Sequence, residues 1–291
     1  MQRGAVIIEA AINGITQKAA NPNVPRSSEE IAADALACFE AGAAIVHNHV
    51  DVSGDPGLVT RAYLEAWAPV LEARPDALIY PTANAIDGVL NLDHLALLAD
   101  TGQLRVSLCD PGSVNLGRTD DEGVPVGGFV YANSFDSIEA QFVRADKDRV
   151  GPSLAIYEPG FLRATLAWWR AGRLPAGSMI KFYLSTDRGY MGAPFGLPPT
   201  RLALDAYLEA LGECPVPWAV SVVGGDVVET GLAEYAVERG GHIHLGLEFY
   251  GGDRTPSNAE LVAEAVAVCD RLGVPVASCD EAADILELPR R

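Results

Sequence analysis

The sequence predicts an α/β fold, a (β/α)8 TIM barrel, on three observations. Short apolar runs suited to strands alternate with amphipathic, helix-like segments along all 291 residues, which is typical of a parallel sheet. There are eight such runs, the number that closes a barrel. No GxGxxG motif follows the first run, which argues against a rival Rossmann or flavodoxin-like sheet. No linker-like stretch divides residues 1–291, so we expect a single domain.

The eight predicted strands are short apolar runs. They cover residues 5–10, 44–49, 77–82, 104–109, 153–158, 179–184, 218–223 and 242–248. Amphipathic helices are predicted between them, for example at 27–42, 201–212 and 257–273. Ser27 or Ser28 is expected to cap the first of these helices, and Gly42 is expected to end it. The pattern is weakest at 110–150, where we expect an extended Gly-rich loop around 110–135, a kind of loop that often has a function.

Composition and charge narrow the class of protein. Hydrophobic residues make up 49% of the chain, but no apolar run reaches the roughly 18 residues of a membrane span. The formal net charge of −18 disfavours nucleic acid and anionic membranes as partners. Glu9 interrupts the apolar stretch at the amino terminus before a signal-peptide core is complete, so we expect a cytoplasmic protein. The five cysteines show no CxxC spacing, which indicates free thiols.

Two histidines, His47 and His49, end the second predicted strand. Side chains alternate along a strand, so both project to one face while Asn48 projects to the other. In the eighth strand, "HIHLGLE", the same alternation turns His244 and Glu248 toward the barrel axis. Barrel active sites lie at the carboxyl ends of the strands, and strands eight and two are separated by one neighbour. Glu248 is therefore expected to meet the two histidines.

This set of side chains predicts a metal site. Two imidazoles and one carboxylate leave coordination positions open, as in a catalytic zinc site. The same set suits Fe²⁺ or another divalent metal. A pair of buried, hydrogen-bonded histidines without a metal is the alternative interpretation.

Two segments of the sequence show a family resemblance. Residues 10–50 include "AINGITQKAANPNVPRSSEEIAADALACFEAGAAIVHNHV", and residues 240–286 include "GGHIHLGLEFYGGDRTPSNAELVAEA". Both segments resemble the β-keto acid cleavage enzyme family, typified by the 3-keto-5-aminohexanoate cleavage enzyme, and this chain looks like a divergent member. The resemblance implies a zinc-dependent barrel that exchanges acyl groups. In that reaction a β-keto acid and acetyl-CoA, the co-substrate, give acetoacetate and an acyl-CoA. The resemblance implies zinc ligands and substrate-binding positions, and we also expect a homo-oligomer. The implied zinc ligands are His47, His49 and Glu248, and the implied substrate-binding positions are Thr82 and Ser107. We also expect Asn13 to bind substrate.

The chain departs from the family pattern at positions that transfer protons or select substrates. The family's arginine and catalytic aspartate in the last strand correspond here to His244 and Phe249. A glutamate expected in the fifth strand appears as Ala155. The glutamate that binds the amino group of an aminated substrate falls near Thr16. The resemblance therefore preserves the metal ligands but leaves the base and the substrate open.

Three groups are candidates for the catalytic base: Glu9 and Glu158, which end the first and fifth strands, and His244 inside the eighth. Their alternative roles are solvated loop carboxylates and, for His244, a buried hydrogen-bond donor to Glu248. We rank the two carboxylates first and expect His244 to lie beneath the metal. A metal-dependent carbon–carbon lyase or hydrolase that does not use CoA is the alternative function. A metal-binding protein without turnover is the third.

Two further features have simpler interpretations. The Gly224-Gly225 turn after the seventh strand suits either a bound CoA diphosphate or an ordinary turn. His94 lies in a helix-like segment, and we expect it to face solvent.

Overall fold

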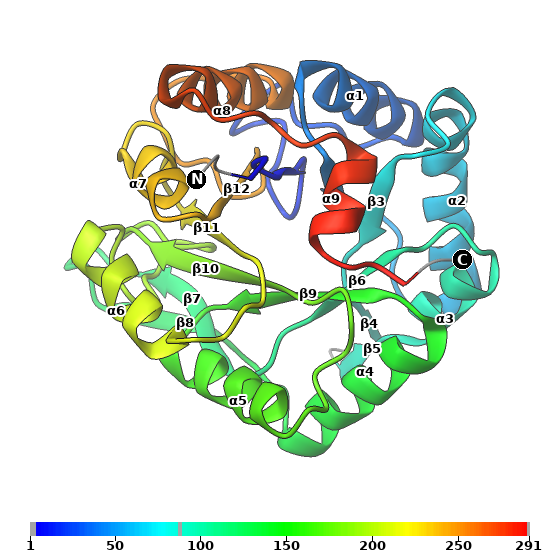
Figure 1. Ribbon diagram of the computed structural model, residues 1–291, viewed down its shortest axis with the longest axis horizontal. Coiled ribbons are helices and arrows are strands. Elements are labelled where there is room, and N and C mark those ends of the chain that lie inside the picture. Colours follow the sequence, from blue (N-terminus) through cyan, green and yellow to red (C-terminus); the bar gives the residue numbers. More distant parts are fainter. Residues whose placement is uncertain (1–3, 87–88, 290–291) are drawn as a thin grey trace.

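The computed structural model describes residues 4–86 and 89–289, and its eight predicted strands form one parallel sheet curved into a nearly closed barrel (Figure 1). The strand order is β3-β2-β1-β12-β11-β10-β9-β6, and the two end strands contact each other. The predicted (β/α)8 barrel is confirmed. The strands are β1 (Ile8–Ala11), β2 (Ile45–Asn48), β3 (Leu78–Pro81), β6 (Val106–Cys109), β9 (Gly151–Ile156), β10 (Met179–Ser185), β11 (Trp218–Val223) and β12 (His242–Leu245).

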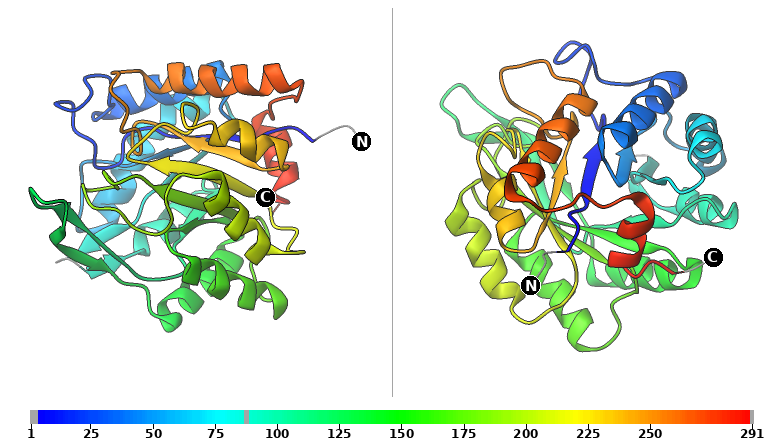
Figure 2. Two further views of the ribbon diagram at one scale, coloured as in Figure 1. Left: turned by 90° about the vertical axis from the view of Figure 1, so that its left-hand side faces the viewer. Right: turned by 45° about the horizontal axis from the view of Figure 1, so that its top comes forward.

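Helices surround the barrel as an outer ring (Figures 1 and 2). The predicted helix signals hold in the first of them, because Ser27 forms a capping box with Glu30 and Gly42 ends the helix at a φ of 116°. The helices are α1 (Ser28–Ala41), α2 (Pro56–Ala73), α3 (Asp93–Asp100), α4 (Phe135–Asp148), α5 (Pro159–Arg170), α6 (Arg201–Leu211), α7 (Leu232–Glu238), α8 (Asn258–Leu272) and α9 (Cys279–Ile285).

The register between strands decides which side chains meet inside the barrel. Glu9 of β1 pairs with His244 of β12, and His47 of β2 pairs with Tyr80 of β3. Alternate residues along each strand face the helices instead, as Phe182 of β10 does when it stacks on α6. Most buried apolar side chains lie in this layer between sheet and helices. The barrel interior holds the buried polar groups together with aromatic rings such as Tyr183.

The region predicted as an extended loop, around residues 110–135, contains an antiparallel hairpin. It is formed by β7 (Val114–Thr119) and β8 (Pro125–Tyr131), and it projects from the end of the barrel opposite the chain termini (Figure 2, left). The sequence conceals this hairpin because β8 is largely exposed and carries Gly127 and Gly128 at positive φ. No apolar alternation marks such a strand. A smaller hairpin joins β4 (Asn84–Ile86) to β5 (Val89–Asn91).

His94 does not face solvent as expected. Its side chain is buried against α2, where it stacks on Tyr63, and its Nε2 lies 2.8 Å from the carbonyl oxygen of Thr82. The short helix α3 turns the His94 side chain toward α2. A helical context alone therefore did not determine how exposed this side chain is.

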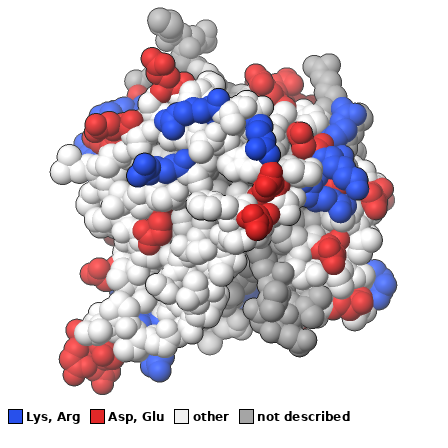
Figure 3. Space-filling view, turned by 90° about the horizontal axis from the view of Figure 1, so that it is seen from below, with Lys and Arg blue, Asp and Glu red and all other residues white. Residues whose placement is uncertain are grey.

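The outer surface carries charges of both signs. On the face seen from below, basic and acidic side chains are interspersed (Figure 3). Within the described ranges, no helix is long and apolar enough to cross a bilayer. All five cysteines are buried free thiols, as the sequence predicted.

Candidate metal centre and the polar interior of the barrel

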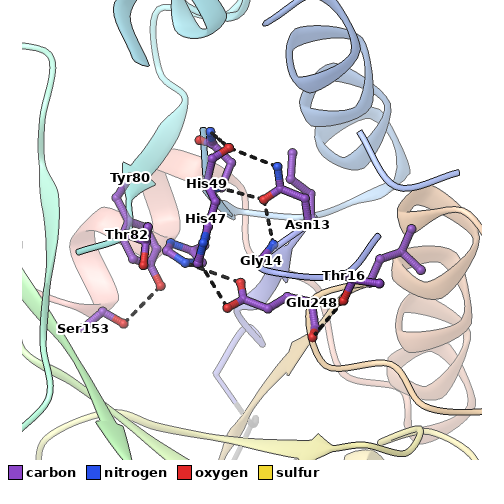
Figure 4. A network of polar contacts seen from close by, with 12 residues as sticks. Asn13, Gly14, Thr16, His47, His49, Tyr80, Thr82, Ser153 and Glu248 are labelled. Atoms are coloured by element: carbon purple, nitrogen blue, oxygen red, sulfur yellow. Dashed lines mark hydrogen bonds and ion pairs between the residues drawn. The ribbon is translucent and has the colours of Figure 1, made fainter. Parts of the chain in front are cut away.

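His47, His49 and Glu248 converge at the carboxyl-terminal end of the barrel (Figure 4). Nε2 of His47 lies 3.5 Å from Oε2 of Glu248, and Nε2 of His49 lies 3.3 Å from Oε1. One ligand atom of each residue lies within 4.8 Å of the others. His49 Nε2 and Glu248 Oε2 are buried and have no hydrogen-bond partner among the residues described. Buried lone pairs that face each other are unfavourable unless a cation lies between them, so this donor set fits a divalent metal.

Protonation also favours metal binding. Burial lowers the pKa of His47 to about 3. Burial opposes the ionisation of Glu248, but the two histidines and the hydroxyl of Tyr190, which donates to Oε1 at 3.1 Å, lower the pKa of this carboxyl to about 2. At neutral pH the triad therefore offers a neutral His47 and a carboxylate, the forms that bind a metal.

Glu248 reaches this position through a turn and not as part of the strand. The eighth strand was predicted to extend to residue 248, but β12 ends at Leu245. Gly246 follows with a φ of 129°, and a Cβ atom there would lie 2.1 Å from the carbonyl oxygen of Ala11. The backbone N–H of Glu248 then donates to the same carbonyl at 3.1 Å. The close approach to β1 that only glycine permits thus sets the position of Glu248, the third candidate ligand.

Asn13 holds the second histidine in place. Its Oδ1 accepts hydrogen bonds from the backbone N–H groups of Gly14 and His49, each at 2.8 Å, and its Nδ2 donates to the carbonyls of Pro25 and His49, each at 3.0 Å (Figure 4). With both ends of the amide bound to backbone, Asn13 is placed to orient His49 and not to contact a substrate. These contacts favour a positioning role over the predicted contact with a substrate.

Gly14→Ala is expected to weaken zinc binding by about 10–100-fold, the range seen when support of a metal ligand is lost. A Cβ atom at Gly14 would lie 2.3 Å from Cγ of Glu248, so the ligand must move. Competition with a chromophoric chelator measures the affinity. Gly273→Ala is the matched control, because Gly273 also has a positive φ, 65°, but nothing lies within 4 Å of the added atom. Equal zinc affinity in the two variants would contradict this account of Glu248.

Glu9 was predicted to be a rim carboxylate, and the structure places it below the metal centre instead. It is 1% exposed, and its Oε1 lies 3.0 Å from Nζ of Lys181. The hydroxyl of Tyr80 donates to the same oxygen, and Lys181 donates to the Tyr80 oxygen at 2.8 Å. Glu9 is therefore neutralised by a buried lysine and shielded from the mouth of the barrel. Its geometry does not suit a base that contacts substrate.

His244 lies beside Glu9 and not against Glu248. Its Nε2 is 3.4 Å from Oε1 of Glu9, and its ring stacks on Tyr183 with the ring centroids 5.5 Å apart. Burial and the neighbouring charge of Lys181 lower the pKa of His244 well below its usual value. The expectation that His244 lies deep in the barrel holds, but the hydrogen bond to Glu248 of the alternative interpretation is absent from the described contacts.

The remaining predicted site residues divide between the two faces of the barrel wall. Thr82 lies beside Tyr80 and the metal centre (Figure 4). Ser107 lies on the helix-facing side of β6, in a cavity between α3 and α4. Glu158 is the N-cap of α5 and accepts a hydrogen bond from the Gly196 backbone N–H at 3.0 Å. Burial is the main cause that raises the pKa of Tyr207 on α6, and the charge of Glu158 is the second cause. The Glu158 carboxylate therefore also lies toward the helix layer. Ser107 and Glu158 are not brought to the metal centre.

The sequence interpretation missed several inward-facing groups. Lys181 interrupts an apolar strand at an inward position, which is a signal for a buried ion pair. Asp110 follows the last residue of β6 and is buried, with its carboxylate bound by the hydroxyl of Tyr131 at 2.7 Å. Tyr183 and Tyr190 were unremarkable in sequence, because aromatic residues are as common in a core as in a site.

The Gly224-Gly225 turn lines a groove of about 700 Å³ at the same end of the barrel. Arg188 and Arg254 contribute positive charge to it, but each is already paired with acidic groups. Five acidic residues line the groove against these two arginines: Asp187, Asp226, Glu229, Asp253 and Glu264. This balance does not favour a bound diphosphate, so the ordinary-turn interpretation is the better supported of the two.

Comparison with known proteins identifies a protein family that matches nearly the whole chain. A family model described as "beta-keto acid cleavage enzyme" matches residues 5–288. The 3-keto-5-aminohexanoate cleavage enzyme of Acetoanaerobium sticklandii is 25% identical over 98% of this chain and 99% of that protein. The 3-oxoadipate:acetyl-CoA acetyltransferase of Cupriavidus necator is 26% identical over 97% of this chain and 95% of that protein.

Solved structures support the fold. The apo structure of ObcA has a TM-score of 0.70 at 15% identity and covers 92% of this chain and 66% of that one. An N-acetylneuraminic acid synthetase from Leptospira borgpetersenii has a TM-score of 0.53 at 11% identity and covers 97% and 90% of the two chains.

Proposed function

Because this chain belongs to the beta-keto acid cleavage enzyme family, we propose that it is a metal-dependent enzyme that exchanges acyl groups between a β-keto acid and acetyl-CoA. The products are acetoacetate and the CoA thioester of the remaining acyl fragment. The observation that carries this proposal is the cluster of His47, His49 and Glu248 at the mouth of the barrel. The use of acetyl-CoA is supported by the name of the Cupriavidus necator relative. Zinc is the expected metal, and Fe²⁺ is the alternative.

The exchange needs a negative charge to develop beside two carbonyl groups. A divalent ion held by the triad would supply a positive charge to the keto and carboxylate oxygens of the substrate. Loss of a proton from the carbon between them lets that carbon bond to the acetyl carbonyl and release CoA. CoA then adds to the original keto carbon, and the bond to the acyl fragment breaks. The protein must bind the substrate, exclude water and accept the proton.

The walls above the buried ion pair are suited to an uncharged acyl fragment. Tyr183 and Phe249 have ring centroids 5.0 Å apart, and Tyr157 lies 5.0 Å from Tyr183 in the same way. These rings bury apolar surface, which favours substrates whose acyl fragment has no charge. Thr82 lies beside the candidate metal cluster, which supports its proposed hydrogen bond to a substrate oxygen.

The aminated substrate named for two relatives, 3-keto-5-aminohexanoate, is expected to react at least about 10-fold less efficiently than its uncharged analogue, because a buried ammonium without a partner is costly. Thr16, which lies near the position of the family's amine-binding glutamate, instead donates a hydrogen bond to the carbonyl of Glu248 at 3.4 Å. Comparing kcat/KM for the two compounds tests this expectation. A clear preference for the amine would overturn it.

Formation of a CoA thioester is the decisive assay. Purified zinc-loaded protein is incubated with a panel of β-keto acids and acetyl-CoA, and acetoacetate and acyl-CoA are separated and quantified. The proposal requires both products in equal amounts. Cleavage of the keto acid at the same rate without acetyl-CoA would favour the lyase or hydrolase alternative, and no cleavage of any panel member would leave a metal-binding protein.

We further propose that the chain acts as one domain over residues 1–291, in the cytoplasm, as a homo-oligomer. Five buried free thiols suit a reducing compartment. Light scattering after size-exclusion chromatography measures the oligomeric state.

A further inference from the structure

The proposed reaction needs a group that accepts a proton near the metal centre. Three of the carboxylates described above do not suit this task. Glu248 is a metal ligand, Glu9 is bound by Lys181 and Tyr80, and Glu158 lies toward the helix layer. Phe249 has no titratable group. Among the residues that the structure describes, Asp110 is a buried carboxylate that this scheme has not yet used.

The topology places Asp110 on the inner side of the barrel, at the same end as the candidate metal cluster. Leu108 of β6 pairs with Ser153 of β9, and Ser153 faces the interior, where its hydroxyl lies 3.4 Å from that of Tyr80. Asp110 is two residues after Leu108 and therefore turns to the same side. In the barrel, β6 neighbours β3, and β3 neighbours β2, which carries the histidines. Glu248 follows β12, two strands from β2 in the other direction. Asp110 and Glu248 thus flank the histidine pair.

The Asp110 carboxylate is oriented by hydrogen bonds but is not completely buried. The hydroxyl of Tyr131, the last residue of the β7–β8 hairpin, donates to Oδ2 of Asp110 at 2.7 Å. The backbone of Ala155 also donates a hydrogen bond to this carboxylate, and the residue remains 8% exposed. Tyr131 in turn lies 6.2 Å, centroid to centroid, from Tyr157 on the aromatic wall. The hairpin that the sequence did not predict therefore orients a carboxylate at the mouth of the barrel.

We propose that Asp110 is the general base of this enzyme. The assignment rests on the proposed function. The Asp110 carboxylate takes a proton from the carbon between the keto and carboxylate groups of the substrate. The C–H bond breaks, an O–H bond forms on Asp110, and the electron pair is shared by that carbon and the keto oxygen. Asp110 returns the proton when the acyl fragment has been exchanged.

Electrostatics agree with this role. Burial raises the pKa of Asp110 to about 6, against the opposing effects of the Tyr131 hydrogen bond and the charge of Lys181, and Glu248 raises it further. The other titratable groups that interact with it are Cys109, Tyr131, Tyr157 and Tyr183. A divalent ion on the triad would lower this pKa, because a nearby positive charge favours the carboxylate. A base whose pKa lies at or somewhat below neutral pH is deprotonated yet still accepts a proton well.

Exchange of the substrate's α-hydrogens with solvent isolates this step. Zinc-loaded protein is mixed with a β-keto acid in D₂O without acetyl-CoA, and deuterium incorporation above the uncatalysed rate is followed by NMR. Asp110→Asn keeps the shape and an acceptor for Tyr131, and it is expected to slow exchange by about 10²–10⁴-fold with unchanged zinc content. Asp205→Asn is the matched control, because it alters a similar tyrosine–aspartate hydrogen bond, to Tyr235, in the helix layer.

The pH dependence supplies a second readout. Activity of the wild type is expected to rise with pH through a pKa at or below about 6, because the base must lose its proton first. Tyr131→Phe removes a hydrogen bond that stabilises the carboxylate, so this acid limb is expected to move to higher pH. Exchange at the wild-type rate in Asp110→Asn, or an unmoved limb in Tyr131→Phe, would overturn the assignment. Absence of exchange in the wild type with every β-keto acid tested would instead count against the proposed function.

Discussion

His49→Ala is expected to lose bound zinc, with an affinity reduced by more than about 100-fold, since even weakening the support of a ligand costs about 10–100-fold. The wild type should bind close to one zinc ion per chain, because the three ligand residues form one cluster. Removal of His49 leaves two ligands, and the carboxylate of Glu248 loses one of its two histidine neighbours. Elemental analysis after dialysis and a chelator competition assay measure the change. Thioester formation should disappear with the metal.

The control for this variant is His242→Asn. His242 is also a buried histidine of β12, but its Nδ1 accepts a hydrogen bond from the backbone N–H of Ile7 at 3.0 Å, and it is not part of the metal cluster. Asparagine can retain that acceptor. Full zinc occupancy in His49→Ala, at the affinity of the wild type, would place the metal site elsewhere.

Lys181→Met is expected to lower the free energy of unfolding by about 3–5 kcal/mol, the usual effect of removing one partner from a buried ion pair. The side chain of Lys181 is 4% exposed and that of Glu9 is 1% exposed, so the variant leaves a negative charge inside the barrel with Tyr80 and a neutral His244 as neighbours. Urea unfolding followed by circular dichroism measures the loss.

The double variant Glu9→Gln/Lys181→Met separates charge from packing. It removes both charges while it keeps an amide near Tyr80, so it should recover much of the lost stability. Equal destabilisation in the double and single variants would mean that the lysine acts by packing alone. Glu9→Gln is also expected to turn over substrate within a few fold of the wild-type rate. Glu9 is buried and paired with Lys181, so its geometry does not suit a base that contacts substrate.

The sequence by itself determined the barrel and singled out the three candidate metal ligands that the structure brings together. The count of eight apolar runs predicted the strands, and all eight occur in the structure. The two-residue period of a strand put His47 and His49 on one face, and the order of strands in a closed barrel brought Glu248 to the same end. Such inferences succeed because they depend on local periodicity and chain order, both of which are written in the sequence.

Only the tertiary structure decided how deep each side chain lies and what it meets. Period two says that Glu9 faces inward, but the stagger between tilted strands sets its height, and that stagger puts it opposite Lys181 and not at the rim. Asn13 was taken from the sequence as a substrate contact, yet its partners are backbone groups of residues 12 and 36 positions away. Asp110 gained its partner from a hairpin whose exposed strand shows no apolar alternation. A polar residue acquires its role from the groups that long-range packing brings to it, and no local pattern specifies those groups.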